Sequence, residues 1–434
     1  MYESAREPDV PEQEQGTPQP APAQTAAERV LALQRTAGNQ AVRALIARDD
    51  TVTAPAPAAA PVLTPEEEVE KAAPDAAANF NAAVAKLTEE RLNELAADAA
   101  WVAKLKGLCS APRFAHLCAA MSLISKHAPK ARAEACRILT IQYADKDVAE
   151  RMMKTVRVVI IPRDKQMTEL EEFRSLATSD SGKGPGKTFD GRQWAHTRGV
   201  GDVVVGSMHY AAITEENLLG GSPDPAVFGA PKDPDGAAIA GGTAGTAAGG
   251  YTPGYSTSTH EFAHIIHRQG LDSADKATIT TAYTAKRAAT VARDKIATLH
   301  WVDGPRVSPT APASWVTAGY TDATYLDHVA GLSDADRRSF ECYASQSEEE
   351  YFAQNANAYL NTNMGTDPTT GEPRHNTRKW VEDNEPADLL ALLDKLFQQG
   401  IVNQLEADGK LSASGTCTNP PPPPPPPPAA TTAP

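Results

Sequence analysis

The sequence predicts an α+β fold, in which a small sheet packs on helices and both ends of the chain lie outside the core. Three observations predict it. Residues 65–150 carry apolar side chains at helical spacing. Residues 156–161 are a β-branched run that Pro162 stops, which is typical of a buried strand. Residues 256–270 hold helix-capping residues at both ends of a short apolar stretch.

The amino-acid composition of both ends of the chain, and of a linker near the N-terminus, differs from that of the rest. Residues 1–24 are rich in Pro, Gln, Glu and Ala, and residues 412–434 contain an unbroken proline run from 420 to 428. Both segments have too few large apolar groups to offset the entropy lost on ordering, so we expect them to be disordered. Residues 49–64, rich in Pro and Ala, are predicted to be a semi-stiff linker.

Residues 25–48 are predicted to be an amphipathic helix or helix pair. Thr25 and Glu28 fit a capping box, and the apolar side chains lie in two patches on either side of Gly38 and Asn39. Because it lies between two arms without a core, such an element is suited to docking on another protein. The alternative is a surface helix that packs on its own protein.

The helical region at residues 65–150 begins at a start signal. Thr64 precedes Pro65, which suits the first helical position, and three glutamates follow in the first turn, where the helix dipole favours them. Later apolar residues continue the helical pattern: Leu87, Leu92, Leu95, Trp101, Leu117, Met121 and Leu123. The region is predicted to be a small bundle. Substrate binding, a pro-segment and a packing spacer are all open as its role.

Residues 260–264 read His-Glu-Phe-Ala-His and carry the strongest chemical signal. Positions i and i+4 lie on one face of a helix, so His260 and His264 can bind one zinc ion at about 2.0–2.1 Å each. Glu261 points to the side of that face, where it can take a proton from metal-bound water. Gly270 stands where a left-handed residue usually ends a helix. The alternative is a surface helix with two solvated histidines.

A zinc protease needs a third ligand, and the sequence excludes one subclass. The metzincin pattern requires a third His at position 270, but the chain has Gly270. His267 is expected beside the site or at the surface, because three ligands from one straight helix converge poorly. Cys342 is expected to be a small buried residue. The remaining option for the third ligand is a carboxylate from a later helix, which is the gluzincin arrangement.

Three consecutive glutamates, Glu348, Glu349 and Glu350, can supply that carboxylate, and spacing does not choose among them. Glu350 also fits a capping box with Ser347, in which its side chain would reach the Ser347 amide instead of a metal. The three could equally form a solvated first turn that the helix dipole favours.

The motif at 260–264, followed by Tyr343, Glu350 and the stretch Tyr-Phe-Ala, resembles the catalytic domain of anthrax lethal factor and its relatives. The resemblance implies a zincin-type metallopeptidase domain at residues 151–411, in which a small mixed sheet packs on the first ligand helix and a second ligand helix. It implies that Glu350 is the third zinc ligand and that Tyr343 faces the zinc. Gln354 stands where relatives often carry Glu.

Segments before the motif fit the same resemblance, which covers about residues 150–400. They include residues 188–194 and 198–201. Residues 210–218 resemble the strand that borders the cleft, so we expect an exposed edge there that can pair with an extended peptide. The stretch from His264 to Glu350 is longer than expected for the family that the chain resembles, so we expect an insertion between about 272 and 335.

Residues 33–42, Leu-Gln-Arg-Thr-Ala-Gly-Asn-Gln-Ala-Val, resemble the leader of toxins carried by bacterial extracellular contractile injection systems, which are phage-tail-like particles. The resemblance implies that residues 25–48 bind tube or loading proteins of such a particle. It implies a protein made in the bacterial cytoplasm without a signal peptide and then exported or injected into a target cell.

Charge, hydropathy and cysteine content narrow the function further. A net charge of −14 argues against nucleic acid as a partner, because phosphate binding needs clustered Lys and Arg. No apolar run is long enough for a transmembrane helix. Five cysteines, an odd number spread along the chain, do not indicate a disulfide framework. We expect a monomer that takes a protein or peptide substrate.

The sequence therefore predicts a Zn²⁺-dependent endopeptidase, acting as a toxin or effector on target-cell proteins. The predicted metal ligands are His260, His264 and Glu350, and the predicted catalytic residues are Glu261 and Tyr343. Two alternatives stay open: a non-catalytic cargo or particle component that uses the same fold for binding, and a protease that cuts only its own chain.

Overall fold

A computed structural model describes residues 63–398 and residue 400, except residues 76, 189–190, 246–253, 367–369, 372 and 375. These residues belong to one compact unit, Leu63–Pro434. The fold is α+β, with many helices and a small mixed sheet, as predicted. The predictions for residues 1–24, for the leader at 25–48, for most of the linker and for the proline-rich tail lie outside the described residues.

The first part of the unit is helical, as predicted, and starts at the predicted residue. Thr64 Oγ1 accepts from Glu67 N at 3.3 Å, and Glu67 Oε2 accepts from Thr64 N at 2.8 Å, which makes a complete capping box. The helices are α2 (Pro65–Ala72), α3 (Ala77–Val84), α4 (Glu89–Ala97), α5 (Ala99–Leu108), α6 (Ala111–Ser122), α7 (Arg132–Gln142) and α8 (Lys146–Thr155). The expectation of helix throughout is wrong at β1 (Leu123–Ile124), because Leu123 pairs with Val158 of the sheet.

The sheet has four strands in the order β1-β2-β4-β3. Strand β2 (Val156–Ile161) ends at Pro162 with every side chain buried except the half-buried Arg157, which confirms the predicted buried strand. Strands β1 and β4 run parallel to β2 on its two sides, whereas β3 runs antiparallel to β4. Their bounds are β3 (Gly199–Val205) and β4 (Met208–Thr214).

The edge strand of the sheet is β3, so the expectation of an exposed edge at residues 210–218 is wrong. Strand β4 pairs on both sides, and the chain then enters α9 (Glu215–Leu219). The two strands form one hairpin, and the resemblance placed the edge on the wrong member of the pair. In β3 the register shifts between Val200 and Val203, and Asp202 there has a φ of 62°. A bulge of this kind bends an edge strand and re-aims its side chains.

Helix α10 (Thr257–Ile265) carries the two histidines and continues into one π-turn, η6 (Ile266–Gly270). Ser256 caps it, since its Oγ accepts from Thr259 N at 3.1 Å. The left-handed conformation expected at Gly270 is wrong, because its φ is not positive. A Cβ at Gly270 would lie 3.0 Å from Val148 Cγ1, so the lack of a side chain there allows close packing on α8.

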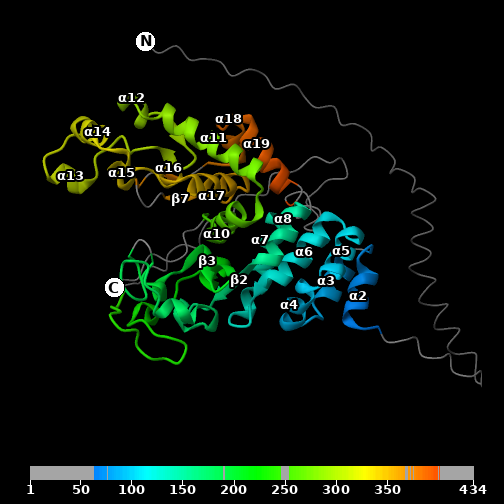
Figure 1. Ribbon diagram of the computed structural model, residues 1–434. Helices are drawn as coiled ribbons and strands as arrows, with labels where there is room; N and C mark the ends of the chain where they lie inside the picture. Colours follow the sequence, from blue (N-terminus) through cyan, green and yellow to red (C-terminus); the bar gives the residue numbers. More distant parts are fainter. Residues whose placement is uncertain are drawn as a thin grey trace, which may run out of the picture. The chain divides into compact units, whose positions relative to one another are not determined.

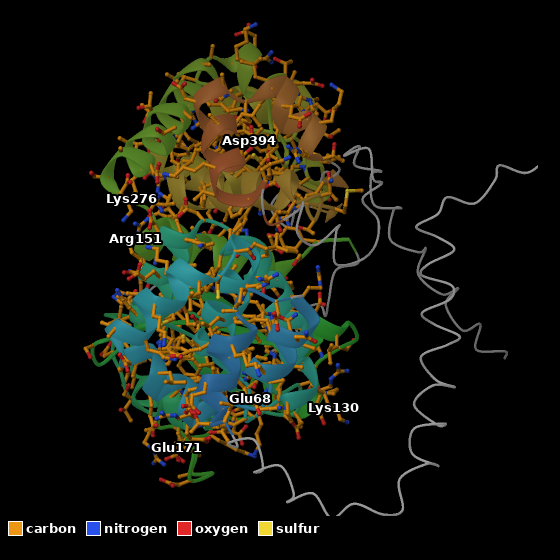
Figure 2. The ribbon with its side chains drawn as sticks, turned by 90° about the vertical axis from the view of Figure 1, so that its right-hand side faces the viewer. Glu68, Lys130, Arg151, Glu171, Lys276 and Asp394 are labelled. Carbon is orange, nitrogen blue, oxygen red and sulfur yellow. The ribbon has the colours of Figure 1, made fainter. Side chains whose placement is uncertain are left out.

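Side chains on both flanks hold the ends of this helix. Gln142 Nε2 donates to Thr259 O at 2.9 Å, near its first turn. At the other end, Arg151 Nε donates to Gly270 O at 2.7 Å and Lys276 Nζ donates to the Arg268 carbonyl at 2.8 Å. Figure 2 shows Arg151 and Lys276 next to each other at this end. One hydrophobic core includes residues of α2–α8 together with residues of α10.

The second part of the unit is mostly helical. Its elements are α11 (Ser273–Ala289), α12 (Arg293–Ile296), β5 (His300–Trp301), β6 (Gly304–Pro305), α13 (Ala313–Thr317), α14 (Asp322–Gly331), α15 (Asp334–Arg337), α16 (Tyr343–Gln346), α17 (Glu348–Tyr359), β7 (Gly365–Thr366), β8 (Pro373–Arg374), α18 (Arg378–Asn384) and α19 (Ala387–Leu393). Within the predicted insertion, Ile296, Val307, Tyr325 and Val329 form a small core of their own. Helix α10 contacts β3 on one side and α17 on another, and Figure 1 shows it between them.

Candidate metal centre

The two histidines of α10 face each other across one helical turn. The Nε2 atoms of His260 and His264 lie 2.9 Å apart, and the two rings are nearly perpendicular, with an interplanar angle of 89°. Both residues are buried, at 3% and 8% exposed. A surface helix with solvated histidines is therefore not what the chain forms.

The carboxylate of Glu350 joins the two imidazoles from α17. Its Oε2 lies 3.1 Å from His260 Nε2 and 3.3 Å from His264 Nε2. Ser347 Oγ accepts from Glu350 N at 3.2 Å, so the serine still caps the helix. The Glu350 side chain does not complete a capping box, because its carboxylate lies with the histidines instead.

The other two glutamates have different surroundings. Glu348 Oε1 lies 3.4 Å from Nε2 of His267, which is buried against the ring of Phe352. Burial lowers the pKa of His267 to about 4. Partial burial would raise the pKa of Glu349, but hydrogen bonds from its own backbone amide and from the Ser347 side chain hold that pKa below its usual value. His267 is thus a buried neighbour of the centre rather than a surface residue.

The three facing atoms lie almost as far apart as the ligand atoms of a small metal ion. Three ligand atoms at about 2.0–2.1 Å from one zinc ion, at tetrahedral angles, lie about 3.4 Å from one another. The observed separations are 2.9, 3.1 and 3.3 Å. Glu350 Oε2 is buried and makes no hydrogen bond of good geometry with the described residues. A cation would satisfy this oxygen and both Nε2 lone pairs together.

Electrostatics within the trio favour a charged carboxylate. Burial alone would raise the pKa of Glu350, but the two histidines outweigh it and hold that pKa well below 4.5. Burial likewise opposes protonation of His264, but Glu350 outweighs it and raises the pKa of His264 above 6.5. The Nδ1 atoms of His260 and His264 make no hydrogen bond with any described residue. Packing therefore sets the ring orientations here, rather than a carboxylate behind each ring.

Glu261 lies against two glycines of the edge strand. A Cβ at Gly199 would lie 3.2 Å from Glu261 Oε1, and a Cβ at Gly201 would lie 2.6 Å from His264 Cβ. These glycines let β3 approach the motif helix closely. The sequence pattern at 198–201 contained this signal, although its reason becomes visible only in the packing.

Tyr343, at the first position of α16, completes the set of predicted residues. Its ring centroid lies 5.6 Å from that of His260. Burial and then the charges of Glu350 and Glu261 raise the pKa of Tyr343 well above 10. The phenol therefore keeps its proton at neutral pH and can act as a hydrogen-bond donor. All five predicted site residues come together.

Two further residues lie beside the centre and were not predicted from the sequence. The ring centroid of Tyr255 is 6.1 Å from that of His260, and the Tyr255 hydroxyl accepts from Gln354 Nε2 at 3.0 Å. The Arg374 guanidinium carbon lies 4.3 Å from the ring centroid of Tyr255 and 5.9 Å from that of Tyr343. Arg374 arrives from β8, far along the chain, and no local pattern marks it.

Other features bear on the sequence predictions. Cys342 is fully buried and in no disulfide, and it does not belong to the His260, His264 and Glu350 group. Two open cavities of about 430 and 630 Å³ run along α11, and no residue of that group lines them. Among the described helices, none combines the length and apolarity that crossing a bilayer requires.

Comparisons with known proteins add no relative. No family model matches the chain, and we found no match among curated proteins or solved structures. The interpretation of the centre therefore depends on its own geometry and chemistry.

Proposed function

We propose that this protein is a zinc-dependent endopeptidase. One observation carries the proposal: His260, His264 and Glu350 direct three metal-ligating atoms to one point from two different helices, with Glu261 beside them. Two imidazoles and one carboxylate, with a coordination position left for solvent, are one of the donor sets of catalytic zinc. The same support favours a zincin-type fold for residues 151–411, similar to that of lethal factor.

The side chains divide the chemistry among them. A Zn²⁺ ion held by His260, His264 and Glu350 would lower the pKa of a bound water to about 7 and polarise the scissile carbonyl. Glu261 takes the proton of the attacking water as a general base and passes it to the leaving amine. Tyr343 donates a hydrogen bond to the oxyanion, a contribution of about 2.7–4 kcal/mol.

The edge strand β3 supplies a surface for an extended peptide. Its only partner among the described strands is β4, and Gly201 places its backbone directly on the motif helix. A peptide that adds to such an edge gains main-chain hydrogen bonds without any demand on its sequence. The peptide backbone would then pass close to the Glu261 carboxylate.

Delivery is the part of the proposal that rests on the leader alone. Residues 25–48 resemble the leader of toxins carried by contractile injection particles, and on that basis we extend the proposal to a cargo effector that cleaves target-cell proteins. Co-purification of the full chain, and of a chain lacking residues 1–48, with particle tube proteins tests this extension. Equal recovery of both chains would contradict it.

The experiment for the enzymatic proposal compares the wild-type protein with Glu261→Gln. Each is loaded with zinc and incubated with cell lysate, and new peptide termini are identified by mass spectrometry. We expect zinc-dependent cleavage products with the wild type and none with the variant, which retains its metal. Equal product sets from the two proteins would refute the proposal. Termini arising only within this chain would reassign it as a self-processing protease.

A further inference from the structure

The hydroxyl of Tyr343 needs a fixed position, but the helix that carries it is short. Helix α16 has four residues, and its N-cap residue Cys342 makes no side-chain hydrogen bond to the helix amides. A single turn is unstable by itself, because nucleating a helix costs more than one hydrogen bond returns. Contacts from elsewhere must therefore hold Tyr343 in place.

Asp303 supplies the capping contact from a distant turn. It lies between β5 and β6, is fully buried, and its Oδ2 accepts from Ala344 N at 3.0 Å. Its other oxygen accepts from Asn363 Nδ2 at 3.2 Å. One carboxylate thereby joins the Tyr343 helix to the segment that follows α17.

Arg374 extends this connection to the ring itself. Arg374 Nε lies 3.6 Å from Asp303 Oδ1, and its guanidinium lies over the rings of Tyr255 and Tyr343. Both charged groups are buried, at 0% and 6% exposed. A buried carboxylate and guanidinium disfavour rearrangement, because separating two opposite charges inside a protein is costly.

We propose that Asp303 and Arg374 are positioning residues for Tyr343. Asp303 fixes the backbone next to the tyrosine, and Arg374, which lies over the rings of Tyr255 and Tyr343, fixes the Tyr343 ring beside His260. Neither residue belongs to the group formed by His260, His264 and Glu350. The inference rests on the proposed function, and it assigns a role to the turn between β5 and β6, which lies within the predicted insertion.

The test uses four variants of the full chain: Asp303→Asn, Asp303→Ala, Arg374→Lys and Tyr343→Phe. Asp303→Asn keeps an oxygen for Ala344 N but loses the charge, so it remains informative should Asp303→Ala fail to fold. We expect Asp303→Ala to lower kcat about 100-fold, the scale of a small misplacement in an active site. Asp303→Asn and Arg374→Lys should have smaller losses. KM and zinc content should stay within twofold.

A double-mutant cycle separates positioning from general damage. In the Tyr343→Phe background, Asp303→Asn should lower kcat no further, because the hydroxyl that it positions is gone. Additive losses would overturn the proposal. The matched control is Asp327→Asn, which breaks an exposed pair with Arg293 in the same insertion and should leave kcat unchanged.

A second readout does not depend on activity. Protein labelled with ¹³C at the tyrosine ζ carbon gives a resonance for Tyr343, assigned by its loss in Tyr343→Phe. We expect that resonance to shift or broaden in Asp303→Asn and Arg374→Lys but not in Asp327→Asn. An unmoved resonance would overturn the positioning role. Should the wild type cleave nothing while the resonance moves, the proposed function fails and the positioning stands.

Discussion

Helix α10 and the α16–α17 segment both contribute to the candidate metal centre, but they reach it by different physical routes. In α10 the helical repeat itself places His260 and His264 on one face. In the second segment, Glu350 and Tyr343 reach the centre only because α17 packs on α10 and because buried charges hold α16. The first half of the site is local in sequence, and the second depends on the whole fold.

This difference explains which parts of the site the sequence could predict. The spacing of His260 and His264, with Glu261 between them, has a direct geometric meaning. Glu350 has none by itself, since Glu348 and Glu349 offer the same chemistry and Ser347 offers a competing capping role. Packing of the two helices makes the choice, and only the resemblance indicated it beforehand.

The largest expected effect comes from the local half. His264→Ala should lose both the metal and turnover, because one of the two facing imidazole ligands is gone. Its cleavage rate should fall to that of the metal-free protein. Metal analysis and peptide cleavage measure the two losses. His300→Ala is the matched control, since that imidazole is exposed on β5. A His264→Ala protein that kept one zinc per chain would contradict the assignment of His264 as a zinc ligand.

The next effect tests the packed half. Glu350→Gln should weaken zinc binding more than about 10- to 100-fold. A loss of that size is typical when a residue that hydrogen-bonds to a metal ligand is removed, and here a charged ligand itself is replaced. Glu348→Gln should keep zinc at the wild-type level, because that carboxylate lies beside His267 and is not in the ligand group. Titration with a competing chelator measures both affinities. If Glu348→Gln lost zinc affinity and Glu350→Gln kept it, Glu348 would be the ligand instead.

Glu261→Gln sharpens the comparison within α10. We expect kcat to fall about 10²- to 10⁴-fold with unchanged zinc content, because the amide cannot accept the proton. Glu215→Gln, at the start of α9, is a control that retains the metal centre and should retain kcat. A Glu261→Gln enzyme as fast as wild type would remove the general-base role.

The smallest effect concerns the contact between the edge strand and the motif helix. Gly201→Ala should lower the free energy of unfolding by about 1–3 kcal/mol, since the new methyl group would overlap His264 Cβ and the Glu261 carbonyl. Gly107→Ala, where nothing lies within 4 Å, should instead stabilise α5 by about 0.5–1 kcal/mol. Urea denaturation compares the two. Equal stability of both variants would show that β3 does not approach the helix so closely.

The fold shows the same division between local and distant causes. The helix start at Pro65 and the buried strand ending at Pro162 were predicted, because each depends on neighbouring residues. The edge strand was misplaced and the conformation of Gly270 was wrong, because both depend on what packs alongside. Asp303 and Arg374 gave no sequence signal, since their partners lie far along the chain.

The central claim is that one metal ion joins the two halves of the site. X-ray data collected at the zinc absorption edge on crystals of the zinc-loaded protein test it most directly. The account predicts one anomalous peak about 2.0–2.2 Å from Nε2 of His260, Nε2 of His264 and a carboxylate oxygen of Glu350. A peak elsewhere, or none at these atoms, would contradict it.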